Sequence, residues 1–172
     1  MSDWAPSDIA WGSFDIGRVD SDLLKLVKAA SMVERNAPHY ADYLFHVFHD
    51  NEAIQSLAKE WADAEMQHGE TLASWAKMAD PDFDFDARFK RYTDGFHIPT
   101  EVTKSIRGSL TGELLARCVV ETGTSSYYTA IRRGTTEPVL HDLCTRIAAD
   151  ELRHYKTFYE LQGSISRRKV SA

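Results

Sequence analysis

Two short motifs in the sequence have the spacing of metal ligands. Glu65-x-x-His68 and Glu151-x-x-His154 each place a carboxylate three residues before an imidazole. Both side chains of such a motif share one face of a helix. A single motif of this kind in a charged helix usually marks a solvated surface, so the argument for metal depends on what accompanies the pair.

Each motif follows a further glutamate at a matched distance. Glu34 precedes Glu65 by 31 residues, and Glu121 precedes Glu151 by 30 residues. Two successive helices would bring such residues to the same depth, as an internal duplication would. The matched spacing predicts six metal ligands, namely Glu34, Glu65, His68, Glu121, Glu151 and His154.

The four glutamates interrupt helical stripes that are otherwise mainly apolar. An unpaired carboxylate in a core costs several kcal/mol, and four together also repel one another. Two divalent cations would balance the four negative charges, with the two imidazoles as neutral ligands. Glutamate and histidine suit iron, with manganese as the alternative. The sequence therefore predicts two iron ions in the core.

Turn residues divide the chain into four long helices, and almost no stretch alternates as a strand would. The predicted helices run from about Ser21 to His49, from Asp50 or Asn51 to Asp80-Pro81, from Thr100 or Ser109 to Arg133, and from Thr136 to near Gly163. Residues 1–18 are predicted to be irregular, and residues 81–100 to form a crossover with a short helical turn. We expect one all-α domain over residues 1–172, with its bundle over about residues 19–163.

Glycine and proline positions refine these boundaries. Gly134 is the predicted C′ residue of the third helix. Thr136 is predicted to cap the fourth helix, with Pro138 in its first turn. Pro38 lies four residues after Glu34 and removes the hydrogen bond that the Glu34 carbonyl would accept, at a cost of about 3 kcal/mol. The expected kink either shapes the metal site or bends the helix around the bundle.

The predicted ligands resemble those of the ferritin-like di-iron proteins, in which two helices supply one Glu each and the other two supply Glu-x-x-His each. Five segments are also similar to motifs of the soluble acyl-acyl carrier protein desaturases. Ile147–His154 is close to their IAADExRH, Trp61–Gly69 to W-x-x-E-E-x-R-H-G, Glu34–Tyr40 to E-x-x-x-P-x-Y, Glu121–Thr124 to E-R-A-T, and Trp4–Asp8 to W-x-P-x-D. The resemblance implies a ferritin-like four-helix bundle with a long crossover between its second and third helices.

The resemblance implies an oxygen-dependent di-iron oxidoreductase acting on an apolar substrate, with a fatty acyl chain as one candidate. Its partners would be dioxygen, this substrate and an external ferredoxin-like electron donor, because the chain has no flavin or iron–sulfur motif. A homodimer packed through the first two helices is also implied. The resemblance gives Thr124 a catalytic role, with its hydroxyl on the oxygen-binding side. The other interpretation of Thr124 is a core residue bonded to a backbone carbonyl.

The chain also departs from the desaturase pattern. It has about half a desaturase's length, so the helices that shape a long acyl tunnel are missing. Ala64 stands where that family usually has a second Glu, and Gln67 replaces an Arg. Asp150 precedes a ligand and is predicted to accept the proton of the His68 imidazole, which would fix its tautomer. With no counterpart at Ala64, support for the two histidines is predicted to be lopsided.

Two other di-iron functions are alternatives. A bacterioferritin-like ferroxidase or iron-storage protein has nearly the same ligands and would form a large assembly. A rubrerythrin-like peroxidase ranks lower, because that family has a carboxylate at the position of Thr124 and a rubredoxin site. Cys118 and Cys144 form no CxxC motif that could supply such a site.

Composition argues against several other classes of protein. The net charge is -6, with no basic stripe to offset it, which argues against a nucleic-acid partner. No apolar run approaches the roughly 18 residues of a membrane span. The first residues have neither a basic nor an apolar region of the kind that directs export. The sequence therefore predicts a cytoplasmic protein.

Overall fold

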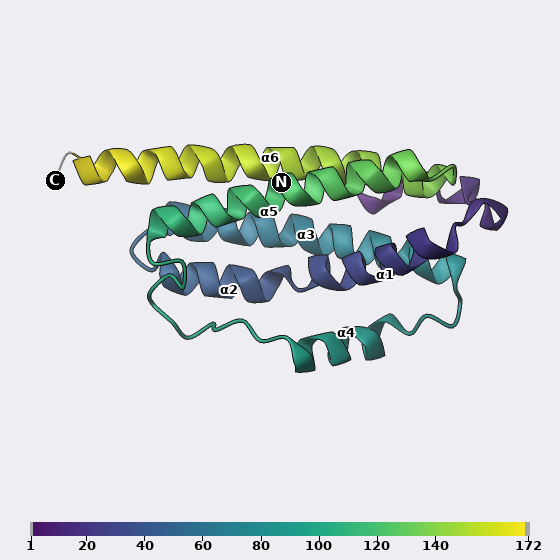
Figure 1. The fold of residues 1–172 in the computed structure, drawn as a ribbon, viewed down its shortest axis with the longest axis horizontal. Coiled ribbons are helices and arrows are strands. Elements are labelled where there is room, and N and C mark those ends of the chain that lie inside the picture. The colour runs from purple at the N-terminus through teal and green to yellow at the C-terminus, as the bar shows by residue number, and fades with distance from the viewer. Residues whose placement is uncertain (1, 171–172) are drawn as a thin grey trace.

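The computed structural model describes residues 2–170, with side chains described as far as residue 163, and all regular structure in this range is helical (Figure 1). Three 3-10 turns come first, at η1 (Pro6–Asp8), η2 (Trp11–Ser13) and η3 (Ile16–Arg18). The α-helices are α1 (Ser21–Arg35), α2 (Ala37–Val47), α3 (Glu52–Ala79), α4 (Phe85–Gly95), α5 (Leu110–Gly134) and α6 (Pro138–Val170). The all-α prediction is therefore confirmed for the described residues.

The long helices lie side by side as two packed pairs (Figure 1). In the first pair, α1 and α2 follow one another along α3. In the second, α5 runs along α6, and contacts between α3 and α6 join the pairs. The crossover between α3 and α5 runs along the outside and contains α4, which touches α1. Among the described helices, none is both long and apolar enough to cross a membrane.

A break at Asn36 divides the predicted first helix, so the single helix over residues 21–49 was wrong. Asn36 has φ -85° and ψ -1°, and its N–H donates to the Val33 carbonyl at 3.1 Å. Pro38 explains the break, because it has no N–H for the Glu34 carbonyl and fits the first turn of a new helix. Glu34 therefore lies in the last turn of α1, next to the break.

Side-chain caps fix the starts of α3 and α5 at positions among those that the sequence predicted. Asn51 Oδ1 accepts a hydrogen bond from the Ile54 N–H at 3.2 Å, so Asn51 rather than Asp50 caps α3. Ser109 Oγ accepts from the Gly112 N–H at 3.0 Å, which selects the later of the two predicted starts of α5. Each cap satisfies a backbone donor that the first helical turn leaves without a partner.

Three predicted details of the α5–α6 region were wrong. Gly134 is the last residue of α5 and has no positive φ, so the left-handed exit that favours glycine is absent there. Glu137 rather than Thr136 caps α6, since its Oε2 accepts from the Leu140 N–H at 2.7 Å. Gly163 does not end α6, because one glycine inside a helix costs only about 1 kcal/mol. Pro138 lies in the first turn of α6 as predicted.

The crossover contains more helix than the sequence indicated. α4 spans Phe85–Gly95 rather than one short turn. Asp84 Oδ1 caps it by accepting from the Ala87 N–H at 3.0 Å. Phe85 and Phe89 stack with ring centroids 5.8 Å apart, and Phe89 in turn stacks on Tyr92. Aromatic side chains three and four residues apart thus stabilise a helix that has few other buried groups.

Two apolar clusters occupy the space between the long helices. One contains Leu72, Trp75, Leu140 and Ile147, and the other contains Leu44, Leu114 and Phe158, all of them almost fully buried. The polar ligand residues of α3 and α6 come between the members of these clusters in the sequence. The core is therefore apolar on both sides of a buried polar centre.

Candidate metal centre

The six predicted metal ligands lie together inside the helices. They come from α1, α3, α5 and α6, and none is more than 7% exposed: Glu34, Glu65, His68, Glu121, Glu151 and His154. This burial follows from their positions in otherwise apolar helical stripes. The structure thus brings together every predicted ligand.

The ligand atoms form two overlapping groups. The atoms within a group all lie within 4.8 Å of one another; the first group is Glu34, Glu65, His68 and Glu151, and the second is Glu65, Glu121, Glu151 and His154. Glu65 and Glu151 belong to both groups. Two neighbouring cations could therefore share these two carboxylates, with one further Glu and one His for each cation.

Both histidines turn their Nδ1 atoms toward the shared carboxylates. His68 Nδ1 lies 3.1 Å from Glu65 Oε2 and 3.3 Å from Glu151 Oε1. His154 Nδ1 lies 2.9 Å from Glu65 Oε1 and 3.4 Å from Glu121 Oε2. Nδ1 is therefore the atom of each ring that could ligate a metal, and Nε2 faces away from the centre.

Several atoms of the centre lack the hydrogen bonds that burial demands. Glu121 Oε2, Glu151 Oε1 and His154 Nδ1 form no well-aligned hydrogen bond and contact only other ligand atoms of the centre, while His154 Nε2 has no partner of any kind among the described residues. Buried polar atoms are rarely left in this state, because the loss of water is then uncompensated. Carboxylate and imidazole ligands suit divalent transition metals. The residues present therefore fit metal binding, without specifying which metal.

Shifted pKa values show how protons compensate the buried charges. Burial raises the pKa of Glu121 to about 8. Burial, together with repulsion from Glu65 and Glu151, raises the pKa of Glu34 well above its usual value. Burial lowers the pKa of His154, but the neighbouring carboxylates outweigh it and raise the value to about 9. A metal ion would take over the charge balance that these protons supply.

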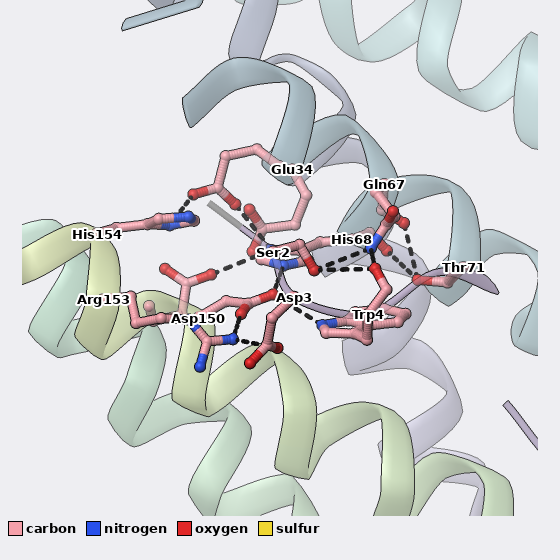
Figure 2. A network of polar contacts seen from close by, with 12 residues as sticks. Ser2, Asp3, Trp4, Glu34, Gln67, His68, Thr71, Asp150, Arg153 and His154 are labelled. Carbon is pink, nitrogen blue, oxygen red and sulfur yellow. Dashed lines mark hydrogen bonds and ion pairs between the residues drawn. The ribbon is translucent and has the colours of Figure 1, made fainter. Parts of the chain in front are cut away.

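The outer side of His68 is held by Asp150, as predicted (Figure 2). His68 Nε2 lies 2.9 Å from Asp150 Oδ2, and both side chains are fully buried. Burial raises the pKa of Asp150, but the hydrogen bond from His68 and further donors lower it overall. One of these donors is the Trp4 indole N–H at 2.8 Å. An ionised Asp150 would fix the His68 ring so that Nδ1 faces the centre.

Trp4 is a site residue that sequence reasoning missed. Its ring stacks on His68 with centroids 6.1 Å apart, in addition to its bond with Asp150. Gln67 Nε2 holds the segment by donating to the Trp4 carbonyl at 2.9 Å, and Arg153 binds Asp3 at 2.8 Å (Figure 2). The W-x-P-x-D similarity had marked Trp4, but nothing in the helical periodicity connected it to a ligand.

His154 has no comparable support. Its Nε2 atom has no hydrogen-bond partner among the described residues. Ala64, at the position in α3 equivalent to that of Asp150 in α6, is buried and has no polar group to offer. The predicted asymmetry between the two histidines is therefore present in the structure.

Thr124 lies at the centre, and its hydroxyl is within hydrogen-bond distance of both a ligand carboxylate and a backbone carbonyl. Its Oγ1 is 2.6 Å from Glu151 Oε2, and it is also 3.0 Å from the Glu121 carbonyl oxygen. The hydroxyl has one proton, so it can donate to only one of these acceptors at a time. The short contact with a shared ligand favours Glu151 as its acceptor, which orients that carboxylate.

Tyr128 is a second residue whose role the sequence did not indicate. It is 1% exposed, and its hydroxyl donates to Glu34 Oε1. Burial and the nearby carboxylates, first among them Glu34, raise the pKa of Tyr128 well above its usual value. The phenol therefore stays protonated and orients Glu34. Tyr128 lies seven residues after Glu121 on the same helical stripe, and this spacing could have indicated that it faces the centre.

Gly69 permits a close approach of α1 to α3 beside the centre. A Cβ atom at this position would lie 2.7 Å from the Arg35 backbone nitrogen and 2.9 Å from the Ser31 carbonyl oxygen. Such distances are too short for non-bonded atoms, and both neighbours are backbone. Gly69 therefore lets Glu34 approach the ligands on α3.

A cavity of about 100 Å³ adjoins the centre between α1, α2, α3 and α5. Its polar side is formed by all four ligand glutamates and Thr124. The remaining lining residues, mainly apolar or aromatic, are Val33, Ala37, Tyr40, Trp61, Arg117 and Val120. A small apolar molecule or dioxygen could therefore reach the ligand atoms from this side.

Comparisons of the chain with protein-family models, with curated proteins and with solved structures found no match.

Proposed function

We propose that this chain is a ferritin-like di-iron protein, with a four-helix bundle formed by α1 with α2, α3, α5 and α6. The observation that supports it is the pair of buried four-residue ligand groups that share Glu65 and Glu151. One glutamate from each of two helices and Glu-x-x-His from each of the other two is the arrangement of that superfamily. Iron is the proposed metal, with manganese as the alternative.

The proposed activity is that of an oxygen-dependent oxidoreductase of the acyl-acyl carrier protein desaturase-like type, acting on an apolar substrate. Two ferrous ions would supply the electrons for the reduction of dioxygen. The protein contributes the ligand geometry, which Asp150 and Tyr128 fix from outside through His68 and Glu34. The mainly apolar walls of the adjoining cavity would exclude water and bind hydrocarbon beside the centre.

The remaining parts of this proposal come from the desaturase resemblance. They are an external ferredoxin-like electron donor and a homodimer packed through α1, α2 and α3. The proposed cytoplasmic location comes instead from the composition of the sequence. Thr124 would act on the oxygen side by orienting Glu151 at the edge of the cavity.

Bacterioferritin-like ferroxidase action is the second candidate. The small volume of the cavity favours it, because about 100 Å³ admits dioxygen and only a short part of any organic molecule. A rubrerythrin-like peroxidase is the weakest candidate, since Thr124 occupies the position where that family has a further carboxylate.

Iron analysis combined with sizing of protein grown with iron tests the proposal. We expect about two irons per chain, because there are two ligand groups. We also expect a small oligomer, as the desaturase resemblance implies. Removal of iron by a chelator should lower the melting temperature, because bound ions stabilise the folded state. Many irons per chain in an assembly of about 24 subunits would move the assignment to iron storage. Protein that binds no divalent metal would refute both candidates.

A further inference from the structure

Arg117 is a buried cation with no hydrogen-bond or ion-pair partner among the described residues. It is 6% exposed, and its Nε atom has no hydrogen-bond partner. No hydrogen bond or ion pair joins its guanidinium to any residue in the part of the chain that the structure describes. Charged side chains are rarely buried unless they are paired, because the lost hydration must be replaced.

Two aromatic rings hold the guanidinium in place. It lies 4.9 Å from the centroid of the Tyr40 ring and 5.9 Å from that of Trp61. Such contacts are attractive, but they bind the face of the group and leave its N–H donors free. The aromatic contacts therefore orient Arg117 without supplying the acceptors that its donors need.

The nearby acidic groups have other partners. Glu121, one helical turn after Arg117, belongs to the metal centre, where two divalent cations would balance the four glutamates. Glu113, one turn before Arg117, forms no ion pair with any side chain that the structure describes. Its Oε2 atom accepts hydrogen bonds from Tyr43 and Ser105, both at 2.7 Å. None of the described acidic side chains therefore forms an ion pair with Arg117.

Arg117 borders two cavities. One is the cavity of about 100 Å³ at the metal centre, and the other, of about 170 Å³, lies between α2, α5 and the crossover. Tyr40 and Arg117 line both. Arg117 and the four ligand glutamates therefore line one cavity together with apolar and aromatic side chains.

We infer that Arg117 binds the carboxylate of a short-chain organic acid whose hydrocarbon part lies in the cavity beside the metal centre. The planar fork of arginine matches a carboxylate with two parallel hydrogen bonds. One guanidinium balances one negative charge, which suits a carboxylate better than a phosphate dianion. A cavity of about 100 Å³ has the volume of about three waters of liquid, so only a few carbon atoms fit. This identification of the substrate class rests on the proposed function.

Calorimetric titration of the wild-type protein with butanoate and with butanamide tests the inference without any substitution. The two probes differ in charge and hardly in shape. We expect butanoate to bind at least tenfold more tightly, since only the anion can form an ion pair with Arg117. Affinity should rise about fourfold per methylene from acetate to butanoate and then level off at octanoate. Equal affinity for acid and amide would overturn the inference, and a continued rise to octanoate would overturn its short-chain part.

Variants separate Arg117 from the metal as the carboxylate-binding group. Arg117→Gln and Arg117→Met should each lose at least tenfold in butanoate affinity, and Arg117→Lys should lose less because it keeps the charge. Arg107→Gln is the matched control, since Arg107 is exposed and lines the second cavity; it should leave the affinity unchanged. Unchanged binding in folded Arg117→Gln would place the carboxylate elsewhere and overturn the inference.

Iron content, measured on the same samples, keeps this inference distinct from the proposed function. Two irons per chain without a preference for the acid would overturn only the role of Arg117. A preference for the acid that depends on Arg117, in protein that binds no metal, would support the anion site and refute the di-iron function.

Discussion

The two histidines of the centre have the same spacing from their glutamates but different surroundings. On the outer side of His68 lie Asp150, which accepts its Nε2 proton, and the ring of Trp4. On the outer side of His154, the equivalent position is Ala64, and Nε2 has no partner among the described residues. The two Glu-x-x-His motifs thus match in sequence, but among the described residues only His68 has a hydrogen-bond acceptor behind its ring.

This difference shows that bringing the ligands together and fixing their orientation depend on different residues. The ligands themselves come from four helices and sit in matching positions, so the chain's periodicity is sufficient to bring them together. Fixing the orientation of an imidazole needs a hydrogen-bond acceptor behind it. For His68 the acceptor is further held by a segment that precedes all the long helices (Figure 2). We therefore expect substitutions to have unequal effects on the two halves.

The largest effect is expected at the two glutamates that both ligand groups share. Glu65→Ala or Glu151→Ala should reduce iron from about two per chain to near zero, because each removes a ligand from both groups. Glu34→Ala or Glu121→Ala should leave about one iron per chain. Elemental analysis after desalting measures this. Glu70→Ala, on an exposed position of α3, is the control. Equal losses at shared and unshared glutamates would contradict the sharing.

Asp150→Asn should weaken metal binding by about 10- to 100-fold, because the amide cannot hold His68 as a carboxylate does. Trp4→Phe keeps the ring and removes one donor to Asp150, so its effect should be smaller. Competition with a chelator of known affinity measures both. Asp142→Asn is the control, because this aspartate of α6 binds Arg146 rather than a histidine. If Asp150→Asn retained metal as well as the control, the role of Asp150 would be refuted.

Gly69→Ala should destabilise the fold by about 1–3 kcal/mol, because its methyl group would collide with the backbone of α1. The residue after His154 is Tyr155, so the other half has no glycine at the equivalent position. Gly123→Ala is the matched control, since nothing lies within 4 Å of its Cβ position and alanine favours a helix by up to about 1 kcal/mol. Chemical denaturation compares them. Equal stability of the two variants would contradict the tight contact.

The smallest effect is expected from restoring symmetry. Ala64→Asp would place a carboxylate where His154 Nε2 has no partner, and should slow metal loss to a chelator by a few-fold. The same substitution in the Asp150→Asn background should recover part of the lost affinity. Faster loss of metal from a folded Ala64→Asp protein would show that the asymmetry has another cause.

Patterns within one helix made most of the centre predictable. Each ligand interrupts an apolar stripe, so period and residue type alone identified all six residues that the structure brings together. The starts of α3 and α5 were also predictable, because Asn51 and Ser109 act within one turn of their own position.

Contacts between distant segments account for what could not be predicted. Glu137 caps α6 partly because the Trp75 indole, 62 residues earlier, also holds its carboxylate, with a donor–acceptor distance of 2.7 Å. The position of Trp4 depends on Asp150 in the last helix. The break at Asn36 is different, because Pro38 predicted a kink within one helix there, whereas the structure has two helices, α1 and α2.

The bond between Trp4 and Asp150 also has a consequence for the order of folding. It joins residues 146 positions apart, whereas α5 and α6 meet through a short connection. Closing a long loop costs more entropy, so helix hairpins should form first and the N-terminal segment should dock late. Segments outside the long helices also open at a lower free energy than core helices do. We therefore expect the Trp4 indole proton to exchange with solvent faster than the amide protons of α3, so that His68 is uncovered by brief local opening while the rest of the centre stays closed.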